Sequence, residues 1–370
     1  MQTSTGPVQP AAQPSPQAKW WRRKRYILLA FVLLLVAGEI AVRVLAGTNS
    51  KFNVFIGAAK EFDPEIGVRL KKNYHNDATH VHINSRGFFG AEFEEKKAPG
   101  GFRVVTLGDS ASFIPARRNY PTVLQDRLRS AYPQRPMEVI NASVPGYSAF
   151  QGHRWYEREV DGYEHDALVI YLGWNDMGQY NPDGLPFKLD EAGYLPQPSL
   201  VHRALSHCYL LRSIYVPLGY WERSRPVSHE PLSEEDQERY EQFYPDHYEK
   251  HLRETIELAK RRGRRVLLLN FASLISDAPT ESELARMHFP RGMGKSLPKY
   301  RLLIAAYSTA LGKVARETQT PIVDIASLFD TPERREVFRD TAHYRVAGAE
   351  RIADRVFQAL KPIVEAMAGK

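Results

Sequence analysis

The tripeptide Gly-Asp-Ser at residues 108–110 ends a short apolar run and presents Ser110. A serine hydroxyl is a weak nucleophile, so serine catalysis needs a base within hydrogen-bond reach. The segment Asp-Thr-Ala-His at residues 340–343 offers His343 as that base, and Asp340 can orient the imidazole and stabilise its charged form. We therefore predict a catalytic triad of Ser110, Asp340 and His343 that performs acyl transfer.

Acyl transfer also requires hydrogen-bond donors aimed at the oxyanion of the tetrahedral intermediate. The candidates are the backbone N–H groups of Ser110 and Gly146 and the side-chain amide of Asn175. Gly146 lies in NASVPGYS at 141–148, and Asn175 lies in GWND at 173–176. Ser110 would also begin a helix, whose N-terminal dipole favours the developing negative charge. These three residues form the predicted oxyanion hole.

Three neighbouring or chemically reactive residues receive structural interpretations. Asp176 is typical of a helix cap or an Asx turn, so we leave it out of the catalytic set. Ser148 lies in GYSAF, which lacks the final glycine of the nucleophile motif G-x-S-x-G. Cys208 is the single cysteine, which excludes an intrachain disulfide and is typical of a small buried apolar residue.

These motifs follow apolar runs that alternate with amphipathic segments from residue 101 onward. Nearly continuous apolar strands separated by helices predict a parallel sheet covered on both faces, which is a three-layer α/β/α sandwich. Because ligands of such sheets bind outside the carboxyl ends of the strands, the motifs can converge there. The predicted strands are 103–107, 137–141, 167–172, 265–270 and 321–325, and the predicted helices are 119–131, 149–160, 235–262, 297–317 and 344–367.

The blocks GDS, NASVPGYS, GWND and DTAH together resemble those of the SGNH hydrolases, also called GDSL-type esterases and lipases. The resemblance covers about residues 80–370, and Gly348 after His343 also fits it. It implies a flavodoxin-like five-stranded sheet, Ser110 as nucleophile and the same triad and oxyanion donors. The chain departs from the pattern at Ile114, where the family often has a glycine.

An N-terminal anchor, an NSRGF-like lead-in and such a domain together resemble membrane-tethered bacterial proteins associated with acylation of the cell envelope or exopolysaccharide. This resemblance implies an acylated carbohydrate as substrate and envelope polysaccharide machinery as a partner. The first hypothesis is a serine esterase that deacetylates a glycan without a metal or organic cofactor. The alternatives are an O-acyltransferase with the same triad and a non-catalytic glycan-binding protein. Trp174, Tyr147 and Tyr180 could stack against a sugar or pack in the core.

The anchor prediction rests on the apolar residues 26–46. Their uninterrupted part is short for a bilayer span, but Glu39 and Arg43 are spaced to pair on one helix face. Including them extends the helix to about 20 residues, which is enough to cross a bilayer. A cleaved signal peptide ending near residue 46 and a soluble core helix are the alternatives.

The chain has 370 residues and a net charge of +7, and five Lys and Arg residues lie in residues 19–25. The remainder is close to neutral, which argues against nucleic-acid binding. The basic cluster predicts a cytoplasmic N-terminus and a periplasmic or extracellular catalytic domain on a single-pass inner-membrane protein. We expect a disordered basic tail (1–25), a transmembrane helix (26–46), a linker and lead-in strand segment (47–100) and the hydrolase-like domain (101–370) with insertions at 177–234 and 276–296.

The lead-in segment holds three histidines close together, His75, His80 and His82. His80 and His82 would share one face of a strand. No third ligand stands at a fixed offset, so we interpret these histidines as surface or packing residues rather than as a zinc site.

Overall fold

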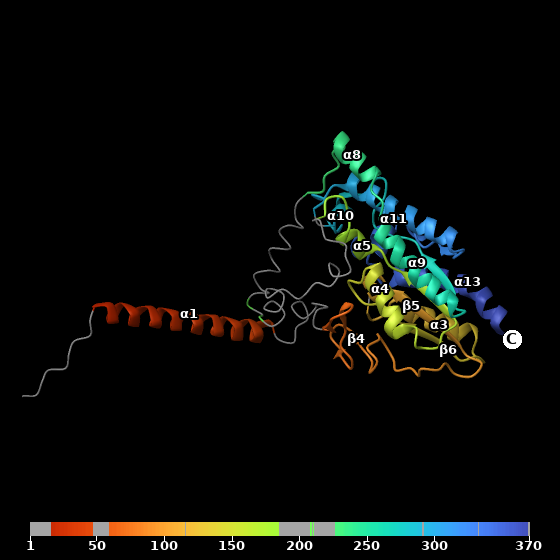
Figure 1. The fold of residues 1–370 in the computed structure, drawn as a ribbon, viewed down its shortest axis with the longest axis horizontal. Helices are drawn as coiled ribbons and strands as arrows, with labels where there is room; N and C mark the ends of the chain where they lie inside the picture. The colour runs from red at the N-terminus through yellow and green to blue at the C-terminus, as the bar shows by residue number, and fades with distance from the viewer. Residues whose placement is uncertain are drawn as a thin grey trace, which may run out of the picture.

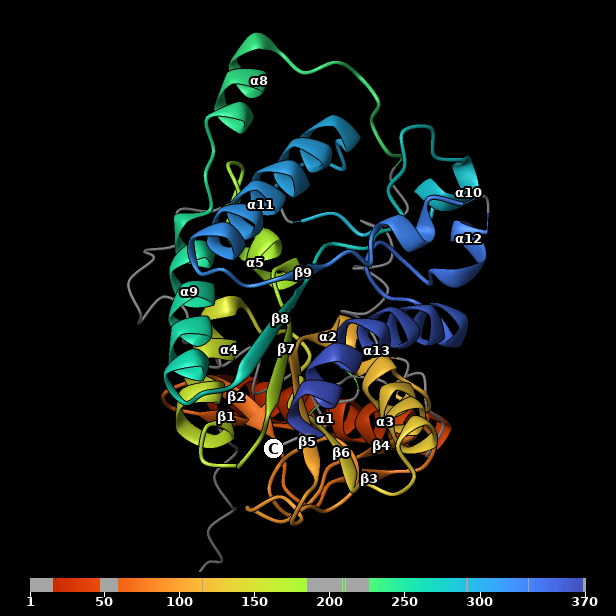
Figure 2. The ribbon, with the colours of Figure 1, turned by 90° about the vertical axis from the view of Figure 1, so that its right-hand side faces the viewer.

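The computed structural model describes residues 16–46, 59–114, 116–184, 208, 210, 226–290, 292–331 and 333–368. Most of the predicted insertion 177–234 and the first fifteen residues of the predicted tail therefore lie outside the described residues. Figure 2 shows a central sheet between helical layers, and Figure 1 shows the long helix α1 (Pro16–Ala46) outside this domain.

The sheet has five parallel strands in the order β6-β5-β7-β8-β9. The first strand of the domain thus lies between the second and third, which is the flavodoxin-like order. The predicted fold class is confirmed. The strands are β5 (Phe102–Gly108), β6 (Met137–Asn141), β7 (Ala167–Tyr171), β8 (Arg265–Leu269) and β9 (Ile322–Val323).

Neighbouring residues of each strand point into different cores, because side chains alternate across a sheet. Val105 belongs to the core beneath α4, α9 and α11, whereas Val104 belongs to the core beneath α3 and α13. Both valines are fully buried. The helices are α2 (Ser110–Phe113), α3 (Tyr120–Ala131), α4 (Ala149–Trp155), α5 (Trp174–Gln179), α8 (Glu234–Glu241), α9 (Asp246–Arg261), α10 (Glu281–Leu284), α11 (Leu297–Glu317), α12 (Arg334–Val337) and α13 (Val346–Ala368). A 3-10 turn, Ser327–Phe329, follows β9.

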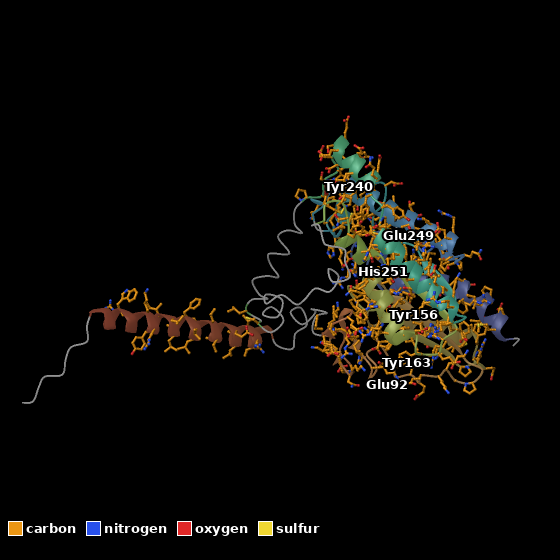
Figure 3. The ribbon with its side chains drawn as sticks, viewed as in Figure 1. Glu92, Tyr156, Tyr163, Tyr240, Glu249 and His251 are labelled. Carbon is orange, nitrogen blue, oxygen red and sulfur yellow. The ribbon has the colours of Figure 1, made fainter. Side chains whose placement is uncertain are left out.

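Two predicted helices are divided in the structure. The segment 149–160 continues from α4 into a π-helical turn, η2 (Tyr156–Val160). The segment 235–262 divides into α8 and α9 at Pro245, which has no backbone N–H with which to continue a helix. Figure 3 marks these elements with Tyr156 on η2, Tyr240 on α8, and Glu249 and His251 on α9.

The lead-in segment forms two small antiparallel hairpins instead of one strand and turn. One joins β1 (Lys60–Asp63) to β2 (Gly67–Leu70), and the other joins β3 (His75–Asn76) to β4 (Val81–His82). An isolated bridge connects Phe89 to Asn141 at the end of β6. Apolar residues from this segment complete the core beneath α4, so the lead-in is part of the folded domain: Ile66, Leu70, Ile83, Phe88 and Phe93.

Helix α1 begins at Pro16, upstream of the predicted apolar span. Within it, the span Arg23–Val44 contains an 18-residue apolar stretch with a mean hydropathy of 2.5, none of which is buried in the protein. This helix is long and apolar enough to cross a membrane, as is also true of a signal sequence. Arg43 Nε donates to Glu39 Oε1 at 2.7 Å, as the i,i+4 spacing predicts, and Glu39 also accepts from the Leu210 backbone N–H at 2.8 Å.

Candidate active site

Ser110, Gly146 and Asn175 follow the carboxyl ends of three adjacent strands. Ser110 begins α2 directly after β5, and Asn175 lies in the first turn of α5 after β7. Gly146 lies in the loop between β6 and α4. Parallel strands end on one side of their sheet, so segments distant in sequence meet along this edge. The edge is the binding side expected for the fold.

The structure joins Ser110, His343 and Asp340 in one hydrogen-bonded chain. Ser110 Oγ lies 2.8 Å from His343 Nε2, and His343 Nδ1 lies 2.7 Å from Asp340 Oδ1. With the proton on Nδ1, the imidazole donates to the carboxylate and can accept the serine hydroxyl hydrogen. Ser110 and His343 are half-buried, so a substrate can approach them. The arrangement can remove a proton from a serine nucleophile.

Asp340 is held by more than the imidazole. Its Oδ1 also accepts the backbone N–H groups of His343 at 3.1 Å and Ala342 at 3.3 Å, which fixes the carboxylate in a tight turn. Burial alone would raise the pKa of Asp340, but the hydrogen bond and charge of His343 lower it to about 2. The carboxylate therefore stays ionised at neutral pH and can stabilise a protonated imidazole.

Asp109 connects the serine to the asparagine. Its Oδ1 accepts from the backbone N–H of Ala111 at 2.8 Å and caps α2, and its Oδ2 accepts from Asn175 Nδ2 at 2.9 Å. Asn175 Nδ2 also donates to the carbonyl oxygen of Tyr147 at 3.1 Å. Burial raises the pKa of Asp109 to about 6, against the opposing effect of these hydrogen bonds. Sequence reasoning missed this role, although an Asp directly before a helix is a recognisable N-cap signal.

Two glycines give the loops their shape. Gly146 has a φ of +90° and Gly173, before α5, has a φ of +130°, and both values disfavour residues with a Cβ. A Cβ on Gly173 would lie 2.6 Å from the Phe271 ring. Ile114, by contrast, has a φ of −102°, which any residue can adopt, so the structure does not require a glycine there.

The backbone N–H groups of Ser110 and Gly146 are the two main-chain donors of the predicted oxyanion hole. Within the described part of the chain, neither N–H donates a hydrogen bond to another protein group. Gly146 is exposed and Ser110 is half-buried. Both donors are therefore available to a ligand.

The aromatic residues near the site have packing roles. Tyr147 is fully buried and its hydroxyl donates to the Val68 carbonyl at 2.7 Å, so it cannot stack against a sugar as sequence analysis allowed. Trp174 is partly buried, with its ring 5.4 Å from that of Phe271. Tyr180 lies with its ring 5.2 Å from Phe243. Of these three residues, only Trp174 and Tyr180 retain exposed surface.

Asp176 is fully enclosed and both its carboxylate oxygens accept from the backbone N–H of Ala149, at 3.0 and 2.9 Å. It thus supplies a negative group at the N-terminus of α4, which the helix dipole favours. Burial raises its pKa to about 7. Ser148 caps the same helix and its side chain bonds with Gln151 in a capping box. Among the residues that the structure describes, neither side chain forms a hydrogen bond with Ser110, Asp340 or His343.

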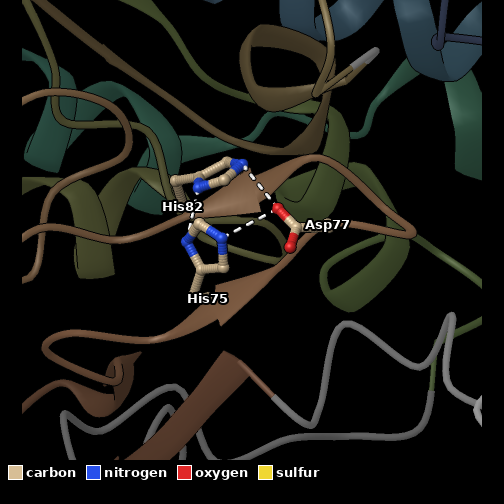
Figure 4. A group of neighbouring side chains, drawn as sticks. All are labelled: His75, Asp77 and His82. Carbon is tan, nitrogen blue, oxygen red and sulfur yellow. Dashed lines mark hydrogen bonds and ion pairs between the residues drawn. The ribbon is translucent and has the colours of Figure 1, made fainter.

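The group predicted from sequence, His75, His80 and His82, is not the group that the structure forms. His75 and His82 face each other across the hairpin and Asp77 joins them, whereas His80 is outside the group (Figure 4). Their Nδ1 atoms are 2.6 Å apart, and His75 Nε2 lies 2.8 Å from Asp77 Oδ1. If each of these two contacts holds one proton, both are hydrogen bonds. If a metal ion bound both Nε2 atoms, each neutral imidazole would carry its proton on Nδ1. Two N–H groups repel each other at this distance, so the rings would have to turn apart.

Several solved structures are similar to this chain. An acetyl xylan esterase is 17% identical, with 70% of this chain and 100% of that chain covered at a TM-score of 0.42. An acetylxylan esterase from Geobacillus stearothermophilus is 16% identical over 70% and 95% of the two chains, with a TM-score of 0.42. A GDSL-like lipase from Bacteroides thetaiotaomicron is 14% identical over 70% and 88%, with a TM-score of 0.40.

The search of curated proteins finds no significant match. The model of the GDSL-like lipase/acylhydrolase family, however, matches residues 106–351, which is well over half of the chain. The matched range begins in β5, just before Ser110, and ends in α13, just after His343. The chain therefore belongs to the GDSL-like lipase/acylhydrolase family of the SGNH hydrolase superfamily.

Proposed function

We propose that this protein is a membrane-anchored serine esterase with Ser110 as nucleophile, His343 as general base and Asp340 as its orienting carboxylate. The observation that carries the proposal is the continuous chain of short contacts, 2.8 Å from Ser110 to His343 and 2.7 Å from His343 to Asp340. Such a chain is the arrangement that activates a serine hydroxyl. Membership in an acylhydrolase family supports the same chemistry.

The reaction follows from these contacts. Ser110 Oγ attacks the ester carbonyl carbon while His343 Nε2 takes its proton, and the C–O bond to the alcohol then breaks as Nε2 returns that proton to the leaving oxygen. Water attacks the acyl-serine in the same way, releasing the acid and restoring Ser110. Asp340 stays ionised throughout and stabilises the imidazolium.

The oxyanion formed in each half-reaction would accept from Ser110 N–H, Gly146 N–H and Asn175 Nδ2. Both hydrogens of the Asn175 amide already have acceptors, Asp109 Oδ2 at 2.9 Å and the Tyr147 carbonyl at 3.1 Å. We expect the oxyanion to replace the longer of these two contacts. Asp109 would then keep the amide oriented, which is the preorganisation that makes such donors effective.

The proposed substrate is an acylated, most simply acetylated, glycan of the cell envelope or an exopolysaccharide. Support comes from the sequence architecture, in which an apolar helix and a lead-in segment precede the hydrolase domain. Helix α1 with its basic flank would tether the enzyme, leaving the catalytic domain outside the cytoplasm. An alkaline phosphatase fusion after residue 370 tests this orientation, because the reporter is active only outside the cytoplasm.

The catalytic test uses the full-length protein in detergent with p-nitrophenyl acetate. We expect hydrolysis that Ser110→Ala reduces by at least about a thousandfold, since the nucleophile itself is removed. The matched control is Ser143→Ala, which removes a buried hydroxyl that has no hydrogen-bond partner in the described protein. Equal rates for wild type and Ser110→Ala would refute the proposed mechanism.

A second assay addresses the substrate. Release of acetate from acetylated oligosaccharides, dependent on Ser110, is the expected result. If an acylated sugar accumulates when an acceptor oligosaccharide is added, the enzyme is a transferase with the same triad. If neither acetate nor acylated sugar forms while p-nitrophenyl acetate is cleaved, the glycan substrate is wrong.

A further inference from the structure

The first hairpin, β1–β2, is fastened to the loop that carries Gly146. Tyr147 donates its hydroxyl to the Val68 carbonyl at 2.7 Å, and Gln151 Nε2 donates to the Ile66 carbonyl at 2.9 Å. A third contact is an ion pair between Arg158 and Asp63 at 3.1 Å. The hairpin lies outside residues 106–351, the range that the family model matches.

Lys60, the first residue of β1, reaches the loop itself. Its Nζ donates a hydrogen bond to the carbonyl oxygen of Pro145. The carbonyl of Pro145 and the N–H of Gly146 belong to the same planar peptide group. A Cβ built on Gly146 would lie 3.2 Å from Lys60 Nζ, which confirms how closely the ammonium approaches this peptide. Lys60 therefore holds one end of the peptide whose other end is a proposed oxyanion donor.

We propose that Lys60 is a positioning residue for the oxyanion hole, which holds the Pro145–Gly146 peptide in plane and strengthens its N–H as a donor. This inference rests on the proposed function of the site. Gly146 has a φ of +90°, a region that glycine adopts as readily as negative φ, so its own backbone preference does not fix the orientation of this peptide. Because the trans peptide is planar, a cation on the carbonyl side leaves the N–H directed to the opposite side.

The charge of Lys60 acts on this carbonyl without competition from an ion pair. Among the residues that the structure describes, no carboxylate lies within salt-bridge distance of Lys60. Burial lowers the pKa of Lys60 to about 8, so the ammonium still predominates at neutral pH. A cation at the carbonyl oxygen draws electron density from the amide, and hydrogen bonds linked in this way reinforce one another. The Gly146 N–H thereby gains positive character where an oxyanion would form.

The test compares kcat and KM for p-nitrophenyl acetate in full-length variants. Removing an oxyanion donor lowers kcat about 10²–10³-fold. Lys60 acts on the donor N–H only through the peptide group, so we expect a smaller effect, with kcat about tenfold lower in Lys60→Met. KM should change less than twofold, because the ester ground state carries no full negative charge. Lys60→Arg, which keeps a charged donor, should recover most of kcat.

The affinity of a trifluoromethyl ketone inhibitor distinguishes the two roles, because a purely structural role of Lys60 would leave this affinity unchanged. It forms a tetrahedral oxyanion adduct, so its affinity should weaken in Lys60→Met by the same factor as kcat. Arg69→Met is the matched control, because Arg69 lies on the same hairpin but pairs with Glu61 at 2.7 Å. It should leave both kcat and inhibitor affinity unchanged.

The outcomes are separable. If Lys60→Met equals Arg69→Met in kcat and in inhibitor affinity, Lys60 has no role in the oxyanion hole. If Lys60→Met does not fold, as judged by circular dichroism, then Lys60→Gln decides, since it keeps an N–H donor without the charge and should still lose kcat. An unchanged kcat in Lys60→Gln would refute the role of the charge. Equal rates for wild type and Ser110→Ala would refute the proposed function, and the role of Lys60 with it.

Discussion

Replacing Asp340 by asparagine isolates the contribution of one negative charge to the proposed triad. The asparagine Oδ1 can still accept from His343 Nδ1 and from the two backbone N–H groups that now meet Asp340 Oδ1. The substitution therefore changes charge more than geometry. The imidazolium that forms as Ser110 attacks would lose its counter-ion.

The size of the effect follows from the pKa of Asp340. Burial opposes the shift, yet the hydrogen bond and charge of His343 lower this pKa from 3.8 to about 2. A difference of this size corresponds to about 2–3 kcal/mol, which is on the order of a hundredfold in rate if it is lost in the transition state. Loss of the correct imidazole tautomer can raise the total to about 10⁴-fold. We expect kcat/KM of Asp340→Asn to fall between these limits.

The same variant tests the pH dependence of folding. The folded pKa of Asp340 is lower than its unfolded value, so the ionised group stabilises the protein above pH 3.8. That stabilisation, about 2–3 kcal/mol, is lost as the pH falls from 3.8 to about 2 and should be absent in Asp340→Asn. Urea unfolding followed by tryptophan fluorescence measures it.

The control for both measurements is Asp354→Asn, which alters a half-exposed carboxylate paired with Arg127 on the surface. It should keep the wild-type rate and the wild-type acid response. If Asp340→Asn stays within threefold of the wild-type kcat/KM, the carboxylate does not support catalysis and the triad argument fails.

Three further substitutions test the site and its support. Asn175→Ala removes the donor to Asp109 and Tyr147, and steady-state kinetics should give a kcat about 10²–10³ lower; an unchanged kcat would exclude its amide from the oxyanion hole. Gly146→Ala forces a Cβ into a φ of +90°, so the free energy of unfolding should fall by about 1–2 kcal/mol, and a value equal to wild type would contradict the strain. Arg103→Met removes the side-chain donor to the carbonyls of Glu95, Lys96 and Glu164 from a buried site, so urea unfolding should show a loss of about 3 kcal/mol; the control Arg129→Met should lose much less.

The sequence by itself determined the class of fold and the identity of the strands. Continuous apolar runs at 103–107, 137–141 and 167–172 predict buried parallel strands, and β5, β6 and β7 occupy those runs within a residue or two. Local chemistry also predicted the Glu39–Arg43 pair. Each of these features depends on neighbours in the chain, so its signal is present in a short window of sequence.

Helix boundaries were less well determined. Pro245 divides the segment predicted as one helix at 235–262, although the amphipathic pattern runs through it. The lead-in segment forms two hairpins that are too short to show a period of two. In both places the pattern of apolar residues reports burial, whereas backbone chemistry and tertiary contacts decide where an element ends.

Only the tertiary structure decided how the site is assembled. The contact between Ser110 and His343 joins residues 233 positions apart, and Lys60 reaches Pro145 across 85 positions. The GDS and DTAH motifs gave chemical reasons to expect the first contact, but no local pattern marks Lys60. A hydrogen bond between distant residues depends on how the sheet brings separate loops to one edge, and residue spacing along the chain carries no record of that distance.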